Sequence, residues 1–207
     1  YNEPGFIFDS KGPMCFSDNR EDLLYAMGVC NSKVGMMFLS LIAPTLDFNP
    51  GAIAKVPYKK YEEQILYDLV SECIALSKED WDTFETSWDF IMHPLLYWKL
   101  KNINYIEKAY VKREEESSYR FNEVKENEEE LNRIIIETYG LEKEISPELE
   151  DKLISINKAD RERDTRSFLS YFIGCIVGRY SLDIKGLTYA GGDFNESKYK
   201  TFKPNPN

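Results

Sequence analysis

The sequence has 207 residues and a formal net charge of −10, with 43% hydrophobic, 14% aromatic and 30% charged residues. A chain of this length and apolar content can bury a core as one large or two small domains, which excludes a disordered protein. Because it lacks an 18-residue apolar window and a basic-apolar leader, we expect a cytoplasmic protein without a membrane partner. Phosphate neutralisation needs a basic surface, so the overall charge argues against general nucleic-acid binding.

The distribution of charge along the chain is uneven. Residues 1–60 carry six acids and six bases, residues 61–160 carry 25 acids and 12 bases, and residues 161–207 carry five acids and eight bases. The acidic excess therefore belongs to the middle of the chain. Any contact with DNA is expected from residues 1–60 or from the last helix. The central region is expected to face solvent or another protein.

The cysteines and the chain ends give two further expectations. The four cysteines are far apart and never form a C-x-x-C pair, which favours buried free thiols in a reducing cytoplasm. They are Cys15, Cys30, Cys73 and Cys175. The sequence starts at Tyr1 without an initiator Met and ends on polar residues. We therefore expect it to be an excerpt from a longer protein.

The first 57 residues are predicted to form a small α/β tip. Short alternating stretches predict strands at three places: residues 5–9, 14–16 and 45–48. Apolar runs on either side of the polar Asn31-Ser32 break predict two short helices, the second stopped by Pro44. A turn at residues 49–51 then leads into about one turn of helix.

From residue 58 onward the pattern predicts long helices. Residues 61–76 form an amphipathic helix, and Ser77 is expected to cap a further helix over 79–90. Residues 95–139 are one continuous helix or an antiparallel pair, because Ser117-Ser118 is compatible with a kink or with a turn. The last helix opens at Asp160, and its apolar interior is expected to be buried on most sides. The fold class is therefore mainly α: a small α/β tip followed by a long-helix bundle.

Polar residues in the tip are candidates for contact with DNA. Lys11 lies in a Gly-Pro turn, where an exposed cation can contact a phosphate, although an ordinary solvated turn has the same composition. Lys33 follows Asn31 and Ser32 at a helix start, where free backbone N–H groups and a cation can hold a phosphate. Helix capping is the alternative for these residues. Asn49, in the last turn of the tip, completes the set.

The densest cationic cluster opens the last helix. It consists of Arg161, Arg163 and Arg166. Three arginines beside a helix start can grip phosphate, for which the planar guanidinium is well shaped. Salt bridges to the acidic middle of the chain are the competing interpretation. By contrast, His93 is the only histidine and lacks partners at ligand spacing, so neither a zinc site nor a histidine-based triad is expected.

The sequence also resembles a known family. The closing part of target-recognition domains in DNA adenine methyltransferases is similar to the stretch LLYAMGVCNSKVGMMFLSLIAPTLDFNPGAIAKVPY. Three further strings narrow the resemblance to the PglX-type methyltransferases of BREX phage-defence systems: WDTFETSWDF, NEEELNRIIIETYGL and GRYSLDIKGLTYAGG. With GFIFDSKGPMCFSDN near the start, they are spread along nearly the whole chain.

The resemblance implies a division of labour. Residues 1–57 would complete a target-recognition domain, and residues 58–207 would form a helical spacer or docking domain. The parent would be an adenine-N6 methyltransferase that acts on double-stranded DNA. The Gly-rich turn for S-adenosylmethionine and the Asn-Pro-Pro-aromatic loop for adenine do not occur here, so we expect no cofactor, no metal and no catalytic residue in this chain. The alternative is a scaffold that docks other defence-system proteins without touching DNA.

Overall fold

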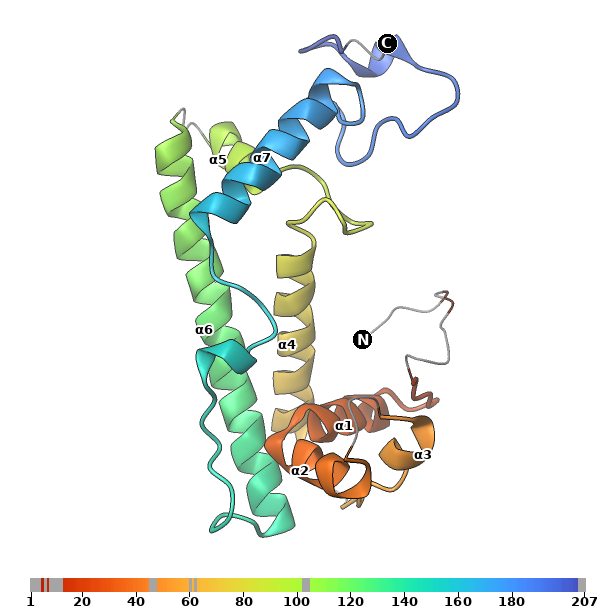
Figure 1. Ribbon diagram of the computed structural model, residues 1–207, viewed down its shortest axis with the longest axis vertical. Helices are drawn as coiled ribbons and strands as arrows, with labels where there is room; N and C mark the ends of the chain where they lie inside the picture. The colour runs from red at the N-terminus through yellow and green to blue at the C-terminus, as the bar shows by residue number, and fades with distance from the viewer. Residues whose placement is uncertain are drawn as a thin grey trace. The chain divides into compact units, whose positions relative to one another are not determined.

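The computed structural model describes residues 5, 7, 13–44, 48–59, 61, 63–101 and 105–204. These residues fold mainly as α-helices (Figure 1), which confirms the predicted class. In the same ranges the β structure is limited to one isolated antiparallel bridge between Tyr180 and Leu187. The α/β tip expected from the sequence is therefore not seen.

The predicted strand at residues 14–16 is wrong. Residues 13–17 are irregular, and Cys15 and Phe16 are exposed. An extended segment forms a strand only when a neighbouring segment pairs with its backbone, and within the described part of the chain residues 13–17 make no such pairing. The other two predicted strands, 5–9 and 45–48, lie largely outside the described residues, as does Lys11.

The two short helices predicted near the N-terminus are confirmed, and a short third one follows them. The helices are α1 (Arg20–Asn31), α2 (Lys33–Ile42) and α3 (Pro50–Ile53). The N-cap of α1 is Asn19, whose side chain accepts a hydrogen bond from the Glu21 N–H at 2.9 Å. A Cβ atom at Gly35 would lie 2.0 Å from the Val29 carbonyl oxygen, so the sharp turn from α1 into α2 requires glycine.

No single helix in the described ranges is long and apolar enough to cross a membrane. Helices α1 and α2 meet the criterion of length and composition only when taken together, across a break where the chain bends by 73°. Four of their large side chains lie in a protein core instead. These are Leu24, Tyr25, Val29 and Val34.

The remaining α-helices of the described residues are α4 (Gln64–Trp81), α5 (Pro94–Leu100), α6 (Ile106–Tyr139) and α7 (Arg161–Ile176). Two 3-10 turns, Asp151–Leu153 and Glu196–Lys198, lie after α6 and after α7. Helix α6 runs unbroken through Ser117 and Ser118 (Figure 1). The Ser117 hydroxyl donates to the Glu114 carbonyl at 3.2 Å, inside the helix, and accepts from the Ala159 N–H at 2.8 Å. The antiparallel-pair alternative is therefore excluded for residues 106–139.

The helix predicted over residues 79–90 is wrong. Ser77 lies inside α4, which continues to Trp81, and residues 82–93 are turns and loop. Short polar side chains hold this loop: the Ser87 hydroxyl donates to the Asp82 carboxylate at 2.6 Å. Such local side-chain bonds compete with the helical backbone pattern. As a result Trp88, which lies in the segment predicted to be helical, is 93% exposed.

The chain forms two compact units. The first unit contains Tyr1–Leu76 and Glu123–Ile154, and the second contains Ser77–Asn122 and Ser155–Asn207. Helices α4 and α6 each contribute residues to both units. The predicted division at residue 57 is one of function and stays a prediction.

The first unit has an apolar core built from α1, α2, the first part of α4 and the last part of α6. Its buried side chains are Leu24, Tyr25, Val29, Val34, Leu66, Tyr67, Val70, Leu131, Ile134, Ile135 and Ile136. Gly28 on α1 lets the backbone of α1 approach α4, because a Cβ atom at this position would lie 3.1 Å from a methyl group of Val70 on α4. Helix α6 ends at Tyr139, and the φ of +73° at the following Gly140 suits a glycine that terminates a helix.

The second unit has a smaller aromatic core. It consists of Phe90, Tyr171, Cys175 and Tyr180, with Met92 and Leu96 packed against it. The rings of Tyr171 and Tyr180 are stacked with their centroids 4.8 Å apart. Gly174 is required for this packing, since a Cβ atom there would lie 2.6 Å from the Tyr180 ring. One face of α7 is thereby fixed against the loop that follows it.

A buried ionic network joins three helices of the second unit. It consists of Asp80 on α4, Arg113 and Arg120 on α6, and Asp164 on α7. The Asp80 Oδ1 atom lies 4.0 Å from Arg113 Nη2 and 3.9 Å from Arg120 Nη2, and Asp164 attracts the Arg113 guanidinium. All four residues are at most 6% exposed. Burial raises the pKa of Asp80, and the two arginines oppose that rise.

Replacement of Leu66 tests the core of the first unit. Leu66 is fully buried, so Leu66→Ala leaves a cavity and is expected to lower the free energy of unfolding by about 2–5 kcal/mol. Ile65→Ala is the matched control, because the side chain of Ile65, next to Leu66 in sequence, is 48% exposed. Urea denaturation followed by circular dichroism measures both. Equal losses for the two variants would contradict the assigned core.

Replacement of Asp80 tests the buried ionic network. Asp80→Ala removes the carboxylate that two buried guanidinium groups share, and because Arg120 keeps its pair with Glu79 at 3.1 Å, the expected cost is about 3 kcal/mol of unfolding free energy. The control is Asp89→Ala, which removes a carboxylate that is 67% exposed and pairs with Lys78. A surface pair of this kind contributes about 1 kcal/mol or less. If both variants lost the same stability in urea, the network would have no special structural role.

Candidate nucleic-acid interface

The polar break between α1 and α2 is a capping structure. Ser32 is 4% exposed, and its hydroxyl donates to the Val29 carbonyl at 2.8 Å and accepts from the Gly35 N–H at 3.1 Å. The Asn31 side-chain amide donates to the Met27 carbonyl at 3.0 Å. These side chains therefore satisfy the backbone groups that the helix ends leave unpaired.

Lys33 is held by carbonyl oxygens of the first unit. Its ammonium group donates to the Ser146 carbonyl at 2.9 Å and also to the Glu148 carbonyl. Its backbone N–H donates to the Asn132 side-chain oxygen at 2.9 Å. The Gly35 N–H donates to the Ser32 hydroxyl, so the backbone N–H groups of Lys33 and Gly35 at the start of α2 already have partners within the protein. The structure thus gives Lys33 a bracing contact between α2 and the segment after α6.

Asn49 is the N-cap of α3. Its side-chain oxygen accepts a hydrogen bond from the Ala52 N–H at 2.9 Å. Three of the predicted DNA contacts in the tip, Asn31, Ser32 and Asn49, therefore cap helices in this structure. Lys11 lies outside the described residues. Contact of these residues with DNA stays a prediction.

The arginine cluster at the start of α7 is built around a capped helix. The Asp160 carboxylate accepts from the Arg163 N–H at 2.7 Å. The Arg163 side chain donates to the Asp164 carboxylate at 3.1 Å and to the Lys158 carbonyl at 3.0 Å, and it lies over the Phe84 ring. Arg163 therefore contributes to the packing of the second unit, and its ion pair is to Asp164 on its own helix.

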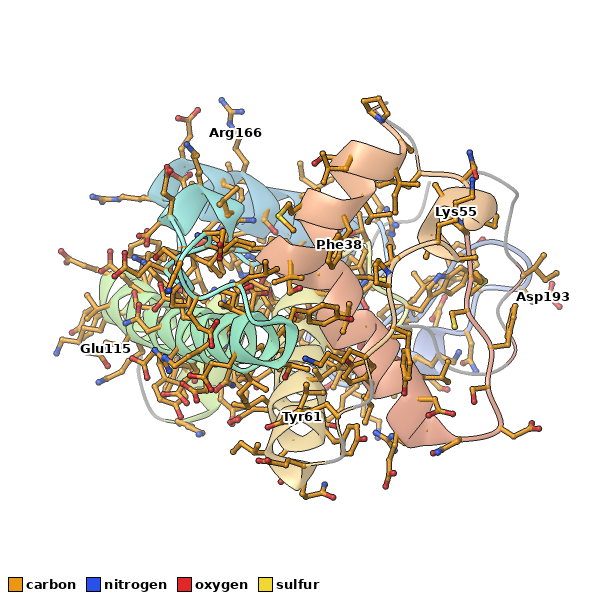
Figure 2. All side chains as sticks on the ribbon, turned by 90° about the horizontal axis from the view of Figure 1, so that it is seen from below. Phe38, Lys55, Tyr61, Glu115, Arg166 and Asp193 are labelled. Carbon is orange, nitrogen blue, oxygen red and sulfur yellow. The ribbon has the colours of Figure 1, made fainter. Side chains whose placement is uncertain are left out.

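Arg161 and Arg166 differ from Arg163 because both are exposed. Arg166 pairs with Glu162, one turn earlier on α7, and both side chains are more than 70% exposed. It projects outward from the helix (Figure 2). Among the residues that the structure covers, Arg161 has no carboxylate within ion-pair distance. Of the three arginines, these two are placed to meet an external anion.

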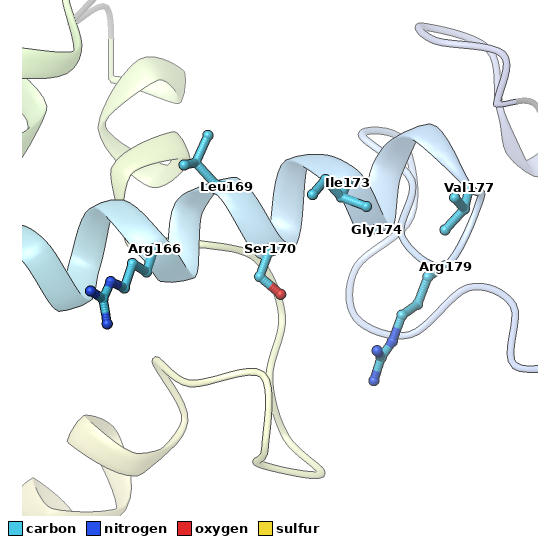
Figure 3. A pocket seen from close by; sticks show the side chains of 7 residues that line it. All are labelled: Arg166, Leu169, Ser170, Ile173, Gly174, Val177 and Arg179. Atoms are coloured by element: carbon cyan, nitrogen blue, oxygen red, sulfur yellow. The ribbon is translucent and has the colours of Figure 1, made fainter.

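A shallow groove of about 460 Å³ runs along the outer side of α7. Figure 3 shows its lining, with Arg166, Ser170 and Arg179 extending to the same side of the helix. The full lining is Arg166, Leu169, Ser170, Ile173, Gly174, Val177 and Arg179. Sequence reasoning missed Arg179, because it follows the end of the helix and belongs to no cationic run.

The prediction that the apolar part of α7 is buried on most sides is wrong. Tyr171 and Cys175 face the aromatic core, and their side of the helix is covered. The other side is open: the exposed large side chains are Leu169, Phe172, Ile173, Ile176 and Val177. The second unit supplies neighbours for only one face of α7, which leaves an apolar stripe beside the groove.

His93 is a buried structural residue. It is 3% exposed, its Nδ1 atom accepts from the Leu95 N–H at 3.3 Å, and its ring packs edge-on against Phe168. Burial lowers the pKa of His93 to about 4, and the nearby Arg113 guanidinium contributes to the shift. The imidazole is therefore neutral in the folded protein at pH 7.

The cysteines are free thiols that differ in burial. Cys175 is buried, Cys30 and Cys73 are half-buried, and Cys15 is exposed. Burial raises the pKa of Cys73 to about 12 and also raises that of Cys30. These thiols are therefore protonated at pH 7. In the described part of the chain, no three His, Cys, Asp or Glu side chains gather in a group that could hold a metal ion.

Comparison with known proteins confirms the resemblance. The chain is 46% identical over 211 residues to the adenine-specific methyltransferase PglX of Lacticaseibacillus casei (strain Zhang), a match covering 99% of this chain and 17% of that protein. It is 34% identical over 226 residues to the adenine-specific methyltransferase BrxX of Escherichia coli O9:H4 (strain HS), covering 98% of this chain and 18% of that protein. The chain thus spans less than a fifth of these relatives. No protein-family model matches it.

The pKa of His93 predicts how stability depends on pH. Because the pKa is lowered on folding, the unfolded chain binds a proton that the folded chain does not bind between about pH 6.5 and 4. The contribution of neutral His93 to the free energy of unfolding is complete above pH 6.5. As the pH falls to about 4, about 3 kcal/mol of that free energy is lost. Proton NMR of this single imidazole is expected to show no titration between about pH 5 and 7. A midpoint near 6.5 would contradict the buried placement.

A stability series separates His93 from a group that acts in the opposite direction. Burial raises the pKa of Glu128 to about 7, so that carboxyl group favours the folded state as the pH falls. His93→Gln is expected to remove the acid-dependent loss of stability, while Glu128→Gln is expected to steepen it. Urea denaturation at a series of pH values compares the two slopes with that of the unchanged protein.

Proposed function

We propose that this chain is a non-catalytic segment of a site-specific adenine-N6 DNA methyltransferase of a phage-defence system, and that it takes part in target recognition. The observation that carries the proposal is the 46% identity to PglX over 99% of the chain. A match of that length includes the helices of both units, so the relationship concerns the whole segment and not one motif.

The division of labour follows from the residue types present. The sequence lacks a Gly-rich strand-to-helix turn and an Asn-Pro-Pro-aromatic loop. We assign S-adenosylmethionine binding, base flipping and methyl transfer to other parts of the whole protein. This segment would hold phosphates and bases of double-stranded DNA while that reaction takes place in the cytoplasm.

The exposed arginines at the start of α7 are the best-placed phosphate contacts. Arg161 and Arg166 reach solvent from the first turns of a helix, where the backbone dipole also favours an anion. The neighbouring Asp160, Glu162 and Asp164 reduce the local positive charge. Binding through this site would therefore be weak in the isolated chain and sensitive to salt.

A protein-docking scaffold is the second candidate function. Two observations favour it: the excess of acids over bases in residues 61–160, and the exposed apolar stripe on α7. An acidic surface repels DNA, while a row of exposed apolar side chains is typical of a protein-binding surface. Other components of a defence system would be the partners in this case.

Titration of a labelled DNA duplex with the 207-residue chain tests the recognition role. Fluorescence anisotropy is expected to show binding whose affinity falls steeply between about 50 and 200 mM salt. Arg161→Glu should weaken binding at least about tenfold and reduce the salt slope by about one phosphate contact. The matched control, Lys152→Glu, reverses a cation that is 72% exposed and paired with Glu150.

Two outcomes would contradict the recognition role. One is the absence of salt-dependent duplex binding at low salt, and the other is an equal loss of affinity for Arg161→Glu and Lys152→Glu. Lys33 is a poor site for such a test, because its ammonium group braces the first unit and charge reversal would disturb the fold. Retained helical signal in circular dichroism is the check that each variant is folded.

A further inference from the structure

The open side of α7 carries apolar side chains at regular helical spacing. Leu169, Ile173 and Val177 are four residues apart and are 53%, 58% and 45% exposed. All three line the groove shown in Figure 3. Single exposed apolar residues are common on protein surfaces, but a continuous row along one helix is the kind of surface that receives another helix.

The charged residues of the groove lie at its two ends. Arg166 comes first along the chain and Arg179 last, and the lining contains no carboxylate. The pair between Arg166 and Glu162 is a surface pair, which contributes about 1 kcal/mol or less, so a partner's carboxylate can replace Glu162. Arg179 lies over the Tyr180 ring and has no ion pair within the described ranges. The groove is thus apolar in the middle and positive at both ends.

This charge pattern argues against a second copy of the chain as the occupant. If two grooves met in antiparallel orientation, Arg166 of each copy would lie against Arg179 of the other. In parallel orientation each arginine would meet its own counterpart. Both arrangements place like charges together, which is unfavourable at an interface.

We infer that the groove on α7 is a docking site for an amphipathic helix of another protein, with an apolar face and a carboxylate near each end. With a rise of 1.5 Å per residue, the distance along α7 from Arg166 to Val177 is about 16 Å. That length corresponds to about three turns of a partner helix. Its apolar residues would follow i, i+4 and i+7 spacing, with one Glu or Asp in the first turn and one in the last.

This inference rests on the scaffold part of the proposed function; it shares Arg166 with the proposed phosphate contacts but does not require DNA binding. DNA is a poorer occupant of the groove, because the apolar floor between the arginines offers nothing to a phosphate backbone. A partner helix uses both parts: the floor buries its apolar face, and each arginine donates charge-assisted hydrogen bonds to one carboxylate. The acidic helix therefore accounts for the whole lining.

Binding of two synthetic peptides to the 207-residue chain tests the inference. The first is a labelled helical peptide of about 15 residues, with leucines at the stated spacing and one glutamate in each terminal turn. The second has lysines in place of the two glutamates. Fluorescence anisotropy is expected to give a Kd of about 1–100 μM for the acidic peptide and at least about tenfold weaker binding for the basic one.

Charge exchange provides the decisive comparison. The double variant Arg166→Glu, Arg179→Glu should bind the acidic peptide at least about tenfold more weakly than the unchanged chain and should bind the basic peptide more tightly. Both side chains are exposed, so the variant is expected to remain folded. Arg133→Glu, a reversal at a side chain that is 52% exposed on α6, is the matched control and should leave both affinities unchanged.

Three outcomes would overturn the inference. Equal binding of the two peptides would mean that the arginines select nothing. Sedimentation showing a dimer that Ile173→Asp dissociates would assign the groove to a second copy. Loss of duplex binding in the arginine double variant, without peptide binding by the unchanged chain, would assign it to nucleic acid. Failure of DNA binding alone would affect the recognition proposal and leave this one standing.

Discussion

The second unit depends on one buried electrostatic arrangement, in which Asp80 lies between the guanidinium groups of Arg113 and Arg120. These charges come from α4 and α6, and Asp164 adds α7 to the same network. A buried charge is tolerated only beside its partners, and the buried Asp164 carboxylate pairs with Arg163 and attracts Arg113, so this side of α7 faces inward. The aromatic core around Tyr171 completes that face. The apolar stripe and the groove remain outside as a direct consequence.

The first unit uses its polar residues in a different way. The side chains that separate α1 from α2 are bonded to the backbone, and Lys33 links the start of α2 to carbonyl groups beyond α6. A lysine placed to bind phosphate and a lysine placed to brace two segments have the same sequence signature. The structure assigns the bracing contact to Lys33, and among the described residues this leaves Arg161 and Arg166 as the exposed cations of the predicted set.

The similarity to PglX and BrxX gives these surfaces a context. Both relatives are named adenine-specific methyltransferases, and the chain matches less than a fifth of each. A large enzyme that must find a DNA site needs surfaces that bind without reacting. The arginine-bearing start of α7 and the apolar groove on the same helix are the two surfaces that we propose for such binding, the first for phosphate and the second for a partner helix.

The sequence by itself determined the features that depend on contacts within a few residues. The break at Ser32, the start of α7 at Asp160 and the end of α6 at Gly140 follow from capping and backbone preferences. The long quoted strings were likewise enough to show the resemblance that the comparisons confirm. Only the tertiary structure decided the rest. Ser117 stays inside a continuous helix and bonds to Ala159, and Lys33 meets carbonyl groups 113 and 115 residues away. The exposure of one face of α7 was also decided only by the tertiary structure. Burial of a helix face depends on which distant residues pack against it, and the local sequence pattern does not contain that information.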